Sequence, residues 1–276
     1  MSEPELHVLP DPDACADAAA ERIAATLAAA VAERGRAHWA TTGGSTPGAI
    51  YRRLARPPLR DEVPWDRVEL WWGDDRFVPF DHPLSNVKMA MSELLQVAAL
   101  GGRSGTGASG IDVATGRLPG VPLPAANVHP FPNGEAIGNG LGAAWAAERY
   151  VEMLRADGPP TEGGWPAFDL ILVGIGPDGH LFSVFPGSEA FDVSRVALAI
   201  PAPTHVEPHV ERVTLHPRVL DVAREIVVVV TGGGKAEVLG EVLGTPPDPR
   251  RLPAQAARRQ GAVWILDEAA AANLAR

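Results

Sequence analysis

The sequence contains a single cysteine, Cys15, among its 276 residues. One thiol cannot form a disulfide within one chain, and it cannot supply a cysteine-rich zinc site. The eight histidines do not make up for this, because none shows the spacing of a metal-binding motif. His205 and His209 are four residues apart, but Pro203 and Pro208 argue against a helix there. We therefore expect no metal ion and no cofactor, with the cytoplasm as the simplest compartment.

Long apolar runs and an excess of positive charge are also missing. No apolar run approaches the roughly 18 residues that a membrane helix needs. Residues 1–10 carry acids and prolines instead of a basic start and an apolar core, so we expect no secretory signal. Acidic residues outnumber basic residues by 34 to 24, a formal net charge of −10. Because a field of that sign repels nucleic acid and anionic membranes, we expect neither as a partner, and local donors must hold any anionic ligand.

The composition that is present is typical of a globular protein with a sizeable core. Apolar residues make up 46% of the chain and charged residues 21%. Residues 168–175 (FDLILVGI) and 225–231 (EIVVVVT) are nearly continuous apolar runs, which favour strands buried on both faces of a parallel sheet. Residues 101–124 are rich in Gly, Ser and Pro and indicate a flexible surface loop. We expect one domain over residues 1–276.

Helix-like segments separate the strand-like runs along most of the chain. Residues 13–34 are alanine-rich, with apolar residues at helical spacing, and Gly35 supplies a stop signal. Residues 196–200 and 213–215 are weaker strand candidates. Strands that alternate with helices predict an α/β fold with a mainly parallel central sheet.

Four polar motifs directly follow predicted strands, which are residues 37–42, 67–73, 168–175 and 225–231. Ligands of open parallel sheets bind outside the carboxyl ends of the strands, so these motifs form the candidate site. The first is residues 42–47 (TGGSTP). Its glycines allow close backbone approach, and the free N–H groups of the following helix start can bind phosphate or carboxylate. A side-chain-capped turn without a ligand is the alternative, and the lysine of a Walker A loop is missing.

Two further motifs offer a cation. In residues 73–76 (GDDR), Arg76 can hold a substrate anion while one aspartate orients the substrate or handles a proton. A solvated turn is the alternative. In residues 231–235 (TGGGK), Lys235 lies near a helix N-terminus, where the helix dipole disfavours a cation. A bound anion would explain that placement, and an exposed lysine is the alternative.

The remaining motif is residues 174–180 (GIGPDGH). It matches the glycine pattern of dinucleotide-binding loops, but Pro186 and Gly187 end any helix soon after it, so the expected crossover helix is absent. We interpret it as a tight glycine turn that presents Asp178 and His180. Histidine titrates near neutral pH and can accept a proton from water. No G-x-S-x-G elbow occurs, so a serine hydrolase triad is unsupported.

Taken in order, the motifs resemble those of the 6-phosphogluconolactonase family. The resemblance runs from about residue 13 to about residue 270, nearly the whole chain. It rests on TTGGSTP (41–47), WWGDDRFVP with a following SN (71–86), DLILVGIGPDGHLFSVFPGS (169–188), ERVTL (211–215) and VVVTGGGKAEVL (228–239). The resemblance implies a three-layer α/β/α Rossmann-like domain. It also implies hydrolysis of 6-phosphoglucono-1,5-lactone to 6-phosphogluconate in the oxidative pentose phosphate pathway.

The resemblance further implies roles for individual residues. The donors that hold the sugar phosphate would be Gly43, Gly44, Ser45, Thr46, Arg76 and Lys235. His180 would activate water, and Asp74, Asp178 and Asn86 would line the same pocket. Arg212 would be a further anion contact. The expected ligand is a sugar-phosphate lactone, and the expected assembly is a monomer or a small homo-oligomer.

Two positions depart from the family, and two other functions remain open. Asp75 stands where the family usually has Glu, and Phe182 stands where it often has a small residue. A glucosamine-6-phosphate deaminase/isomerase has a similar turn, but with a Glu where this chain has Phe185, five residues after the histidine. A non-catalytic sugar-phosphate-binding regulator would not need the acid–base pair of Asp178 and His180.

Overall fold

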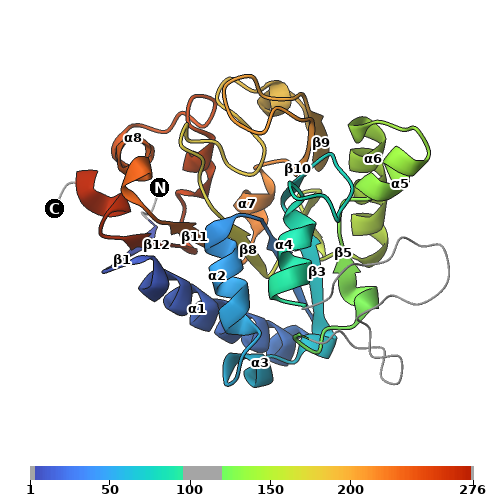
Figure 1. Ribbon diagram of the computed structural model, residues 1–276, viewed down its shortest axis with the longest axis horizontal. Coiled ribbons are helices and arrows are strands. Elements are labelled where there is room, and N and C mark those ends of the chain that lie inside the picture. The colour runs from blue at the N-terminus through green and yellow to red at the C-terminus, as the bar shows by residue number, and fades with distance from the viewer. Residues whose placement is uncertain (1–3, 96–119, 275–276) are drawn as a thin grey trace.

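The computed structural model describes residues 4–95 and 120–274. Within these residues, seven parallel strands form one central sheet (Figure 1). In spatial order they are β1 (Glu5–Leu9), β12 (Ala262–Asp267), β11 (Glu225–Val230), β8 (Leu170–Val173), β2 (Ala37–Thr41), β3 (Val68–Trp72) and β5 (Val128–His129). The two apolar runs became β8 and β11, which confirms the predicted parallel sheet.

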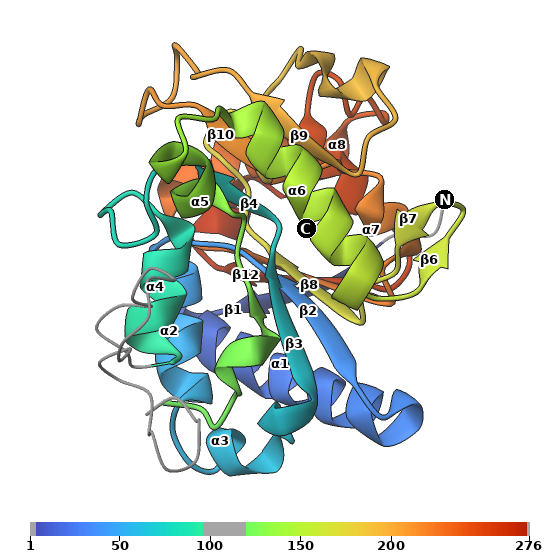
Figure 2. The ribbon, with the colours of Figure 1, turned by 90° about the vertical axis from the view of Figure 1, so that its right-hand side faces the viewer.

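Helices cover both faces of this sheet, so the domain has three layers (Figure 2). They are α1 (Pro12–Arg34), α2 (Ser45–Leu54), α3 (Leu59–Glu62), α4 (Asn86–Glu93), α5 (Asn133–Gly138), α6 (Ala143–Asp157), α7 (Val219–Val222) and α8 (Ala236–Gly244). The ring of Trp39 lies 6.1 Å from that of Tyr51 in α2, and Trp71 lies 5.8 Å from Tyr150 in α6. The two tryptophans are one position apart in the register of β2 and β3, so they point to opposite faces.

Helix α1 packs along one face and contacts strands from β1 to β2. It begins where the Asp11 side chain accepts a hydrogen bond of 2.8 Å from the Ala14 N–H, and it ends at Gly35, whose φ is +77°. Glycine adopts this left-handed conformation without a steric penalty. The predicted helix over residues 13–34 is confirmed.

A small antiparallel sheet extends from the end of β3. It contains β4 (Asp74–Arg76), β10 (Arg212–Leu215) and β9 (Ala197–Ile200), and a separate hairpin joins β6 (Thr161–Glu162) to β7 (Trp165–Pro166). The two weaker strand candidates are therefore confirmed, as β9 and β10. Strand β10 pairs with β4 on one side and with β9 on the other, which brings Arg212 opposite Arg76 and fixes the position of the residues after β3.

The order of the central strands brings the four motifs together. Strands β11, β8, β2 and β3 are consecutive neighbours, and each is followed by one of the four motifs. Of the surface loop predicted over residues 101–124, residues 101–119 lie outside the described residues. In residues 120–124, Val121 and Leu123 are fully buried, so the prediction of an exposed loop is wrong for this end of the segment. In the described part of the chain, every helix is too short or too polar to cross a membrane.

Candidate active site

A cavity of about 190 Å³ lies where these four strands end. One water needs on the order of 10–15 Å³ by the same kind of measure, so the cavity suits a small organic molecule rather than a single ion. Nine of the predicted site residues line it: Gly43, Gly44, Ser45, Thr46, Asp74, Arg76, Asn86, His180 and Lys235. Asp178 and Arg212 do not line the cavity, and their contacts are described below.

The glycine loop brings an uncapped helix start to the cavity. The N-cap of α2 is Gly44, so no side chain bonds to the first N–H groups of this helix. The alternative prediction of a side-chain-capped turn is therefore wrong. The first N–H groups of α2 are available to bind an anion. A Cβ atom at Gly43 would lie 2.2 Å from Asn86 Oδ1, so only glycine fits there. The Thr46 and Thr231 hydroxyls, 3.0 Å apart, join this loop to the loop after β11.

Asp74 is a buried carboxylate held from several sides. Its Oδ2 accepts a hydrogen bond of 2.7 Å from the Ser183 hydroxyl, and its Oδ1 accepts bonds of 3.2 Å from the Thr42 hydroxyl and 3.3 Å from Asn86 Nδ2. These donors orient the carboxylate at the cavity wall. Ser183 is a residue that the sequence reasoning missed, although it stands in the same motif as His180.

Asp75 faces away from the cavity and organises the residues around it. Its carboxylate accepts hydrogen bonds from the Asn86 N–H (2.7 Å), the Arg76 N–H (2.8 Å) and the Ser85 hydroxyl (3.0 Å). Burial raises the pKa of Asp75 to about 7, against the lowering effect of these hydrogen bonds. The shorter side chain at this position therefore still links β4 to the start of α4.

Two cations face the cavity without a carboxylate partner among the described residues. The guanidinium of Arg76 donates to the Leu84 carbonyl at 2.8 Å and to Asn86 Oδ1 at 3.0 Å. Lys235 lies at the end of a short 3₁₀ turn, Gly233–Lys235, and burial alone lowers its pKa. Half-buried cations without a counter-ion create a local positive field in a protein of net negative charge, so this end of the cavity favours an anion.

His180 presents an imidazole to the cavity from a tight glycine turn. Gly179 has φ +82°, and a Cβ atom at Gly176 would lie 1.9 Å from the His180 Nδ1 atom. Asp178 lies behind the ring, with its Oδ1 atom 2.5 Å from His180 Nδ1. Burial raises the pKa of Asp178, but the hydrogen bonds that it accepts from histidine outweigh this and bring the pKa well below its ordinary value. Asp178 is thus ionised and orients the imidazole.

Arg212 does not reach the cavity. It is 3% exposed, and its guanidinium donates to the carbonyls of Pro208 (2.7 Å) and Val210 (3.1 Å). Burial lowers its pKa, and the neighbouring charge of Arg76 adds to this effect. The predicted anion contact of Arg212 therefore finds no support in the geometry of the cavity.

Phe182, the second departure, forms part of the cavity wall. Its backbone has φ +54°, which is unusual for a residue with a side chain. Its ring fills the space beside Gly73, where a Cβ atom would lie 2.3 Å from Phe182 Cε1. The bulky side chain is thus accommodated by the glycine opposite, and it supplies an apolar surface among polar groups.

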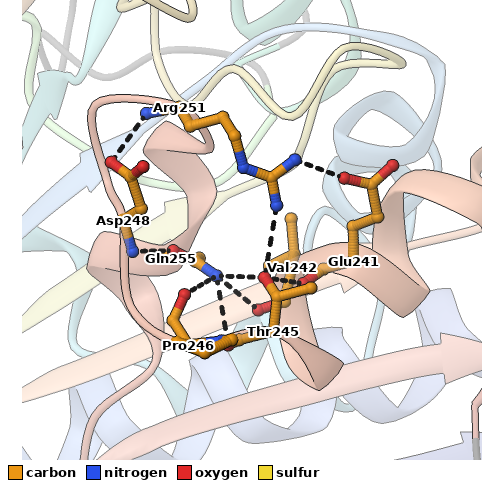
Figure 3. Close-up of polar contacts among 7 residues, drawn as sticks. All are labelled: Glu241, Val242, Thr245, Pro246, Asp248, Arg251 and Gln255. Atoms are coloured by element: carbon orange, nitrogen blue, oxygen red, sulfur yellow. Dashed lines mark hydrogen bonds and ion pairs between the residues drawn. The ribbon is translucent and has the colours of Figure 1, made fainter.

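A network of hydrogen bonds closes a loop after α8 (Figure 3). The buried Gln255 accepts a hydrogen bond of 2.5 Å from the Asp248 N–H, and its amide donates at 3.1 Å to the Thr245 hydroxyl. This network holds residues 245–255 in place. From that loop, the Ala254 N–H donates to the Gly179 carbonyl at 2.9 Å, so the network ends at the turn that carries the imidazole.

Residues 10–265 match the model of the family described as glucosamine-6-phosphate isomerases/6-phosphogluconolactonase. The chain belongs to this family. It is 32% identical over 272 residues to the 6-phosphogluconolactonase of Synechocystis sp. (strain ATCC 27184 / PCC 6803 / Kazusa), with 98% of each chain covered. It is 33% identical over 273 residues to that of Mycobacterium tuberculosis (strain ATCC 25618 / H37Rv), again with 98% of each covered. The resemblance predicted from the motifs is confirmed.

A solved structure shares the whole fold of this family member. The 6-phosphogluconolactonase from Trypanosoma cruzi superposes with a TM-score of 0.78 at 26% identity, covering 100% of this chain and 99% of that one. The three-layer α/β/α arrangement that the resemblance implied is therefore confirmed. In residues 4–95 and 120–274, no cluster of three or more His, Cys, Asp or Glu side chains is arranged to hold a metal ion.

Proposed function

We propose that this protein hydrolyses 6-phosphoglucono-1,5-lactone to 6-phosphogluconate in the oxidative pentose phosphate pathway. One observation carries the proposal: an imidazole backed by an ionised carboxylate shares a cavity with two cations that lack a carboxylate partner among the described residues. The cations suit the phosphate of the substrate, and the imidazole suits a water molecule that attacks the lactone. The proposal describes a cytoplasmic enzyme without a cofactor, a monomer or a small homo-oligomer.

Substrate binding would begin at the phosphate. The N–H groups at the start of α2, Arg76 and Lys235 would hold its oxygens, because backbone donors and cations together form an anion site. The lactone ring would then extend toward His180. Asp74 and Asn86 would bind sugar hydroxyl groups from the cavity wall. Positioning the ring in this way supplies much of the rate enhancement.

The chemical step needs one base and no covalent intermediate. His180 Nδ1–H donates to Asp178, which leaves Nε2 free to take a proton from water. The water oxygen bonds to C1 of the lactone, and the carbonyl oxygen becomes an oxyanion that backbone N–H groups of a glycine turn can stabilise. When the C1–ring-oxygen bond breaks, the imidazolium returns its proton to the ring oxygen. The products are the carboxylic acid and a hydroxyl group.

The geometry argues against the deaminase/isomerase alternative. The position that would need a glutamate carries Phe185, whose ring centroid is 4.8 Å from that of His180. A hydrocarbon ring cannot transfer the proton that opening a sugar ring requires. Incubation with glucosamine 6-phosphate should therefore release no ammonia.

A lactonase assay tests the proposal. The purified protein should hydrolyse the lactone above its spontaneous rate, and His180→Ala should lower kcat by about 100-fold or more, the usual contribution of a general base. Near-wild-type turnover of His180→Ala would remove this residue from the role of base. If the protein binds 6-phosphogluconate but shows no lactonase rate, the result would favour the alternative of a non-catalytic sugar-phosphate-binding regulator.

A further inference from the structure

The Oδ1 atom of Asp178 accepts hydrogen bonds from the ring and from the backbone N–H of His180, and the carboxylate accepts one more that the mechanism above does not use. Its outer oxygen, Oδ2, lies 2.9 Å from Nε2 of His205. His205 belongs to the segment of residues 201–211, between β9 and β10, and its side chain is half exposed. It does not line the cavity, so any effect on the reaction must pass through Asp178.

Phe185 adds an apolar contact to this arrangement. Its ring centroid lies 4.8 Å from that of His180 and 5.6 Å from that of His205, with the His205 ring edge-on. The two imidazoles therefore pack against one phenyl ring. A ring at position 205 is held by packing as well as by its hydrogen bond.

The segment that carries His205 is fastened at several points. The buried Arg212 donates to the Pro208 carbonyl at 2.7 Å and to the Val210 carbonyl at 3.1 Å. The His209 ring contributes a hydrogen bond of 2.7 Å from Nδ1 to the Pro203 carbonyl. These bonds position the segment over Asp178, and they assign Arg212 a structural contact in place of an anion contact.

The chemistry of a carboxylate decides which atoms donate. The hydrogen bonds from the two histidines hold Asp178 in its ionised form, and an ionised carboxylate can only accept hydrogen bonds. Both imidazoles must then donate: His180 through Nδ1 and His205 through Nε2. A donor on Oδ2 opposes rotation of the carboxylate about its Cβ–Cγ bond, so Oδ1 stays directed at His180.

We propose that His205 is a positioning residue for the lactonase reaction: its Nε2–H bond to Asp178 Oδ2 keeps that carboxylate aligned with His180. The inference rests on the proposed function, because it concerns the orientation of the base. It predicts an effect on the chemical step and little effect on substrate binding, because His205 lies outside the cavity.

Two substitutions separate the hydrogen bond from the shape of the ring. His205→Phe keeps a ring against Phe185 but removes the donor, and His205→Gln keeps an N–H donor at a similar reach. We expect His205→Phe to lower kcat about tenfold with KM changed less than about twofold, since small misplacement of a catalytic group is costly. His205→Gln should recover most of the lost kcat. His7→Phe is the matched control: His7 also bonds a carboxylate, Glu5 at 2.7 Å, but on edge strand β1.

Kinetics and NMR both test the inference. Wild-type kcat in His205→Phe would overturn it and leave the proposed function intact, and so would a loss that His205→Gln does not recover. If the wild-type protein itself shows no lactonase rate, the proposed function fails.

Nitrogen-15 NMR of the imidazole rings then decides whether the hydrogen bond between His205 and Asp178 exists. A protonated Nε2 on His205, together with a change of the His180 ring signals in His205→Phe, supports it, and unchanged His180 signals overturn it.

Discussion

The shape of this site depends on two glycines, because a Cβ atom at either position would clash with a residue that lines the cavity. At Gly176, a Cβ would occupy the position of the His180 ring, and at Gly43 it would collide with the Asn86 amide. Neither glycine contributes a functional group of its own. Each allows a neighbouring side chain to reach the cavity, so replacement by alanine would displace His180 or Asn86 without altering any charge.

Lys235 provides a prediction at this scale. Lys235→Ala should raise KM for the lactone about tenfold or more with little change in kcat, because the lysine binds the phosphate equally in the ground state and in the transition state. Steady-state kinetics over a range of substrate concentrations measure both constants. An unaltered KM would exclude Lys235 from the phosphate site, and Lys235→Arg, which keeps the charge, serves as the matched control.

Asp75 provides another prediction. Burial raises its pKa to about 7 from an ordinary value of 3.8, so the folded state holds a proton that the unfolded chain releases at lower pH. This group therefore lowers the free energy of unfolding as pH rises from about 4 to about 7. Asp75→Asn has no such ionisation, so its stability relative to wild type should increase over that range, by at most about 1.4 kcal/mol per pH unit. Urea unfolding at several pH values measures the difference, and a pH-independent difference would contradict the prediction.

At the scale of elements, the turn that carries His180 depends on a loop that contributes no side chain to the cavity. Residues 245–255 lie between α8 and β12, and Ala254 in this loop donates to the Gly179 carbonyl. Gln255 holds the loop closed through hydrogen bonds to the carbonyls of Val242 and Pro246, both at 3.3 Å. The turn after β8 is thus supported on its outer side by a buried amide.

Gln255→Leu tests this support. Loss of the amide leaves the Asp248 N–H and the Pro246 carbonyl without this partner, while Arg258 still donates to the carbonyls of Val242 and Thr245. The free energy of unfolding should therefore fall by about 1–3 kcal/mol. The exposed pair of Arg251 and Glu241 lies in the same region, and Arg251→Ala should cost less than about 1 kcal/mol. Urea denaturation measures the free energy of unfolding of both variants. Equal losses in the two variants would contradict a larger stabilising contribution from the buried amide.

For the whole molecule, the response to acid also involves histidines that do not line the cavity. His38 in β2 is buried, the His129 side chain in β5 is 12% exposed, and His129 Nε2 lies 2.7 Å from Glu69 Oε2. Burial lowers the pKa of each histidine to about 4. Between pH 4 and the ordinary value of 6.5, the unfolded chain binds more protons than the folded one, so acidification destabilises the protein. This trend opposes that of Asp75.

The two opposing contributions can be separated by substitution. His38→Gln and His129→Gln should each make the free energy of unfolding fall less steeply between about pH 6.5 and about pH 4 than in wild type, because one proton-binding difference is removed. Denaturant unfolding at half-unit pH steps measures the slopes. Parallel curves for wild type and both variants would show that these imidazoles do not contribute.

Several elements followed directly from local patterns in the chain. The apolar runs at 168–175 and 225–231 became β8 and β11, and the alanine-rich segment with its glycine stop became α1. The strand pairing of the small sheet did not follow from any pattern. Strands β9 and β10 are short and gave only weak signals, and the pairing of β10 with β4 joins segments more than a hundred residues apart. Hydrophobic periodicity reports burial along one segment and contains no information about its partner.

The candidate site divides in the same way. Glycines after buried strands were enough to predict the turns that line the cavity, because the carboxyl ends of neighbouring parallel strands meet at one edge. The place of Asn86 in the lining, at the start of α4, was implied only by the family resemblance. Nothing local indicates that Arg212 bonds to backbone carbonyls or that His205 reaches Asp178, since both contacts depend on the path of residues 201–211. Covalent order and side-chain chemistry determine which groups are available, and long-range packing decides which of them meet.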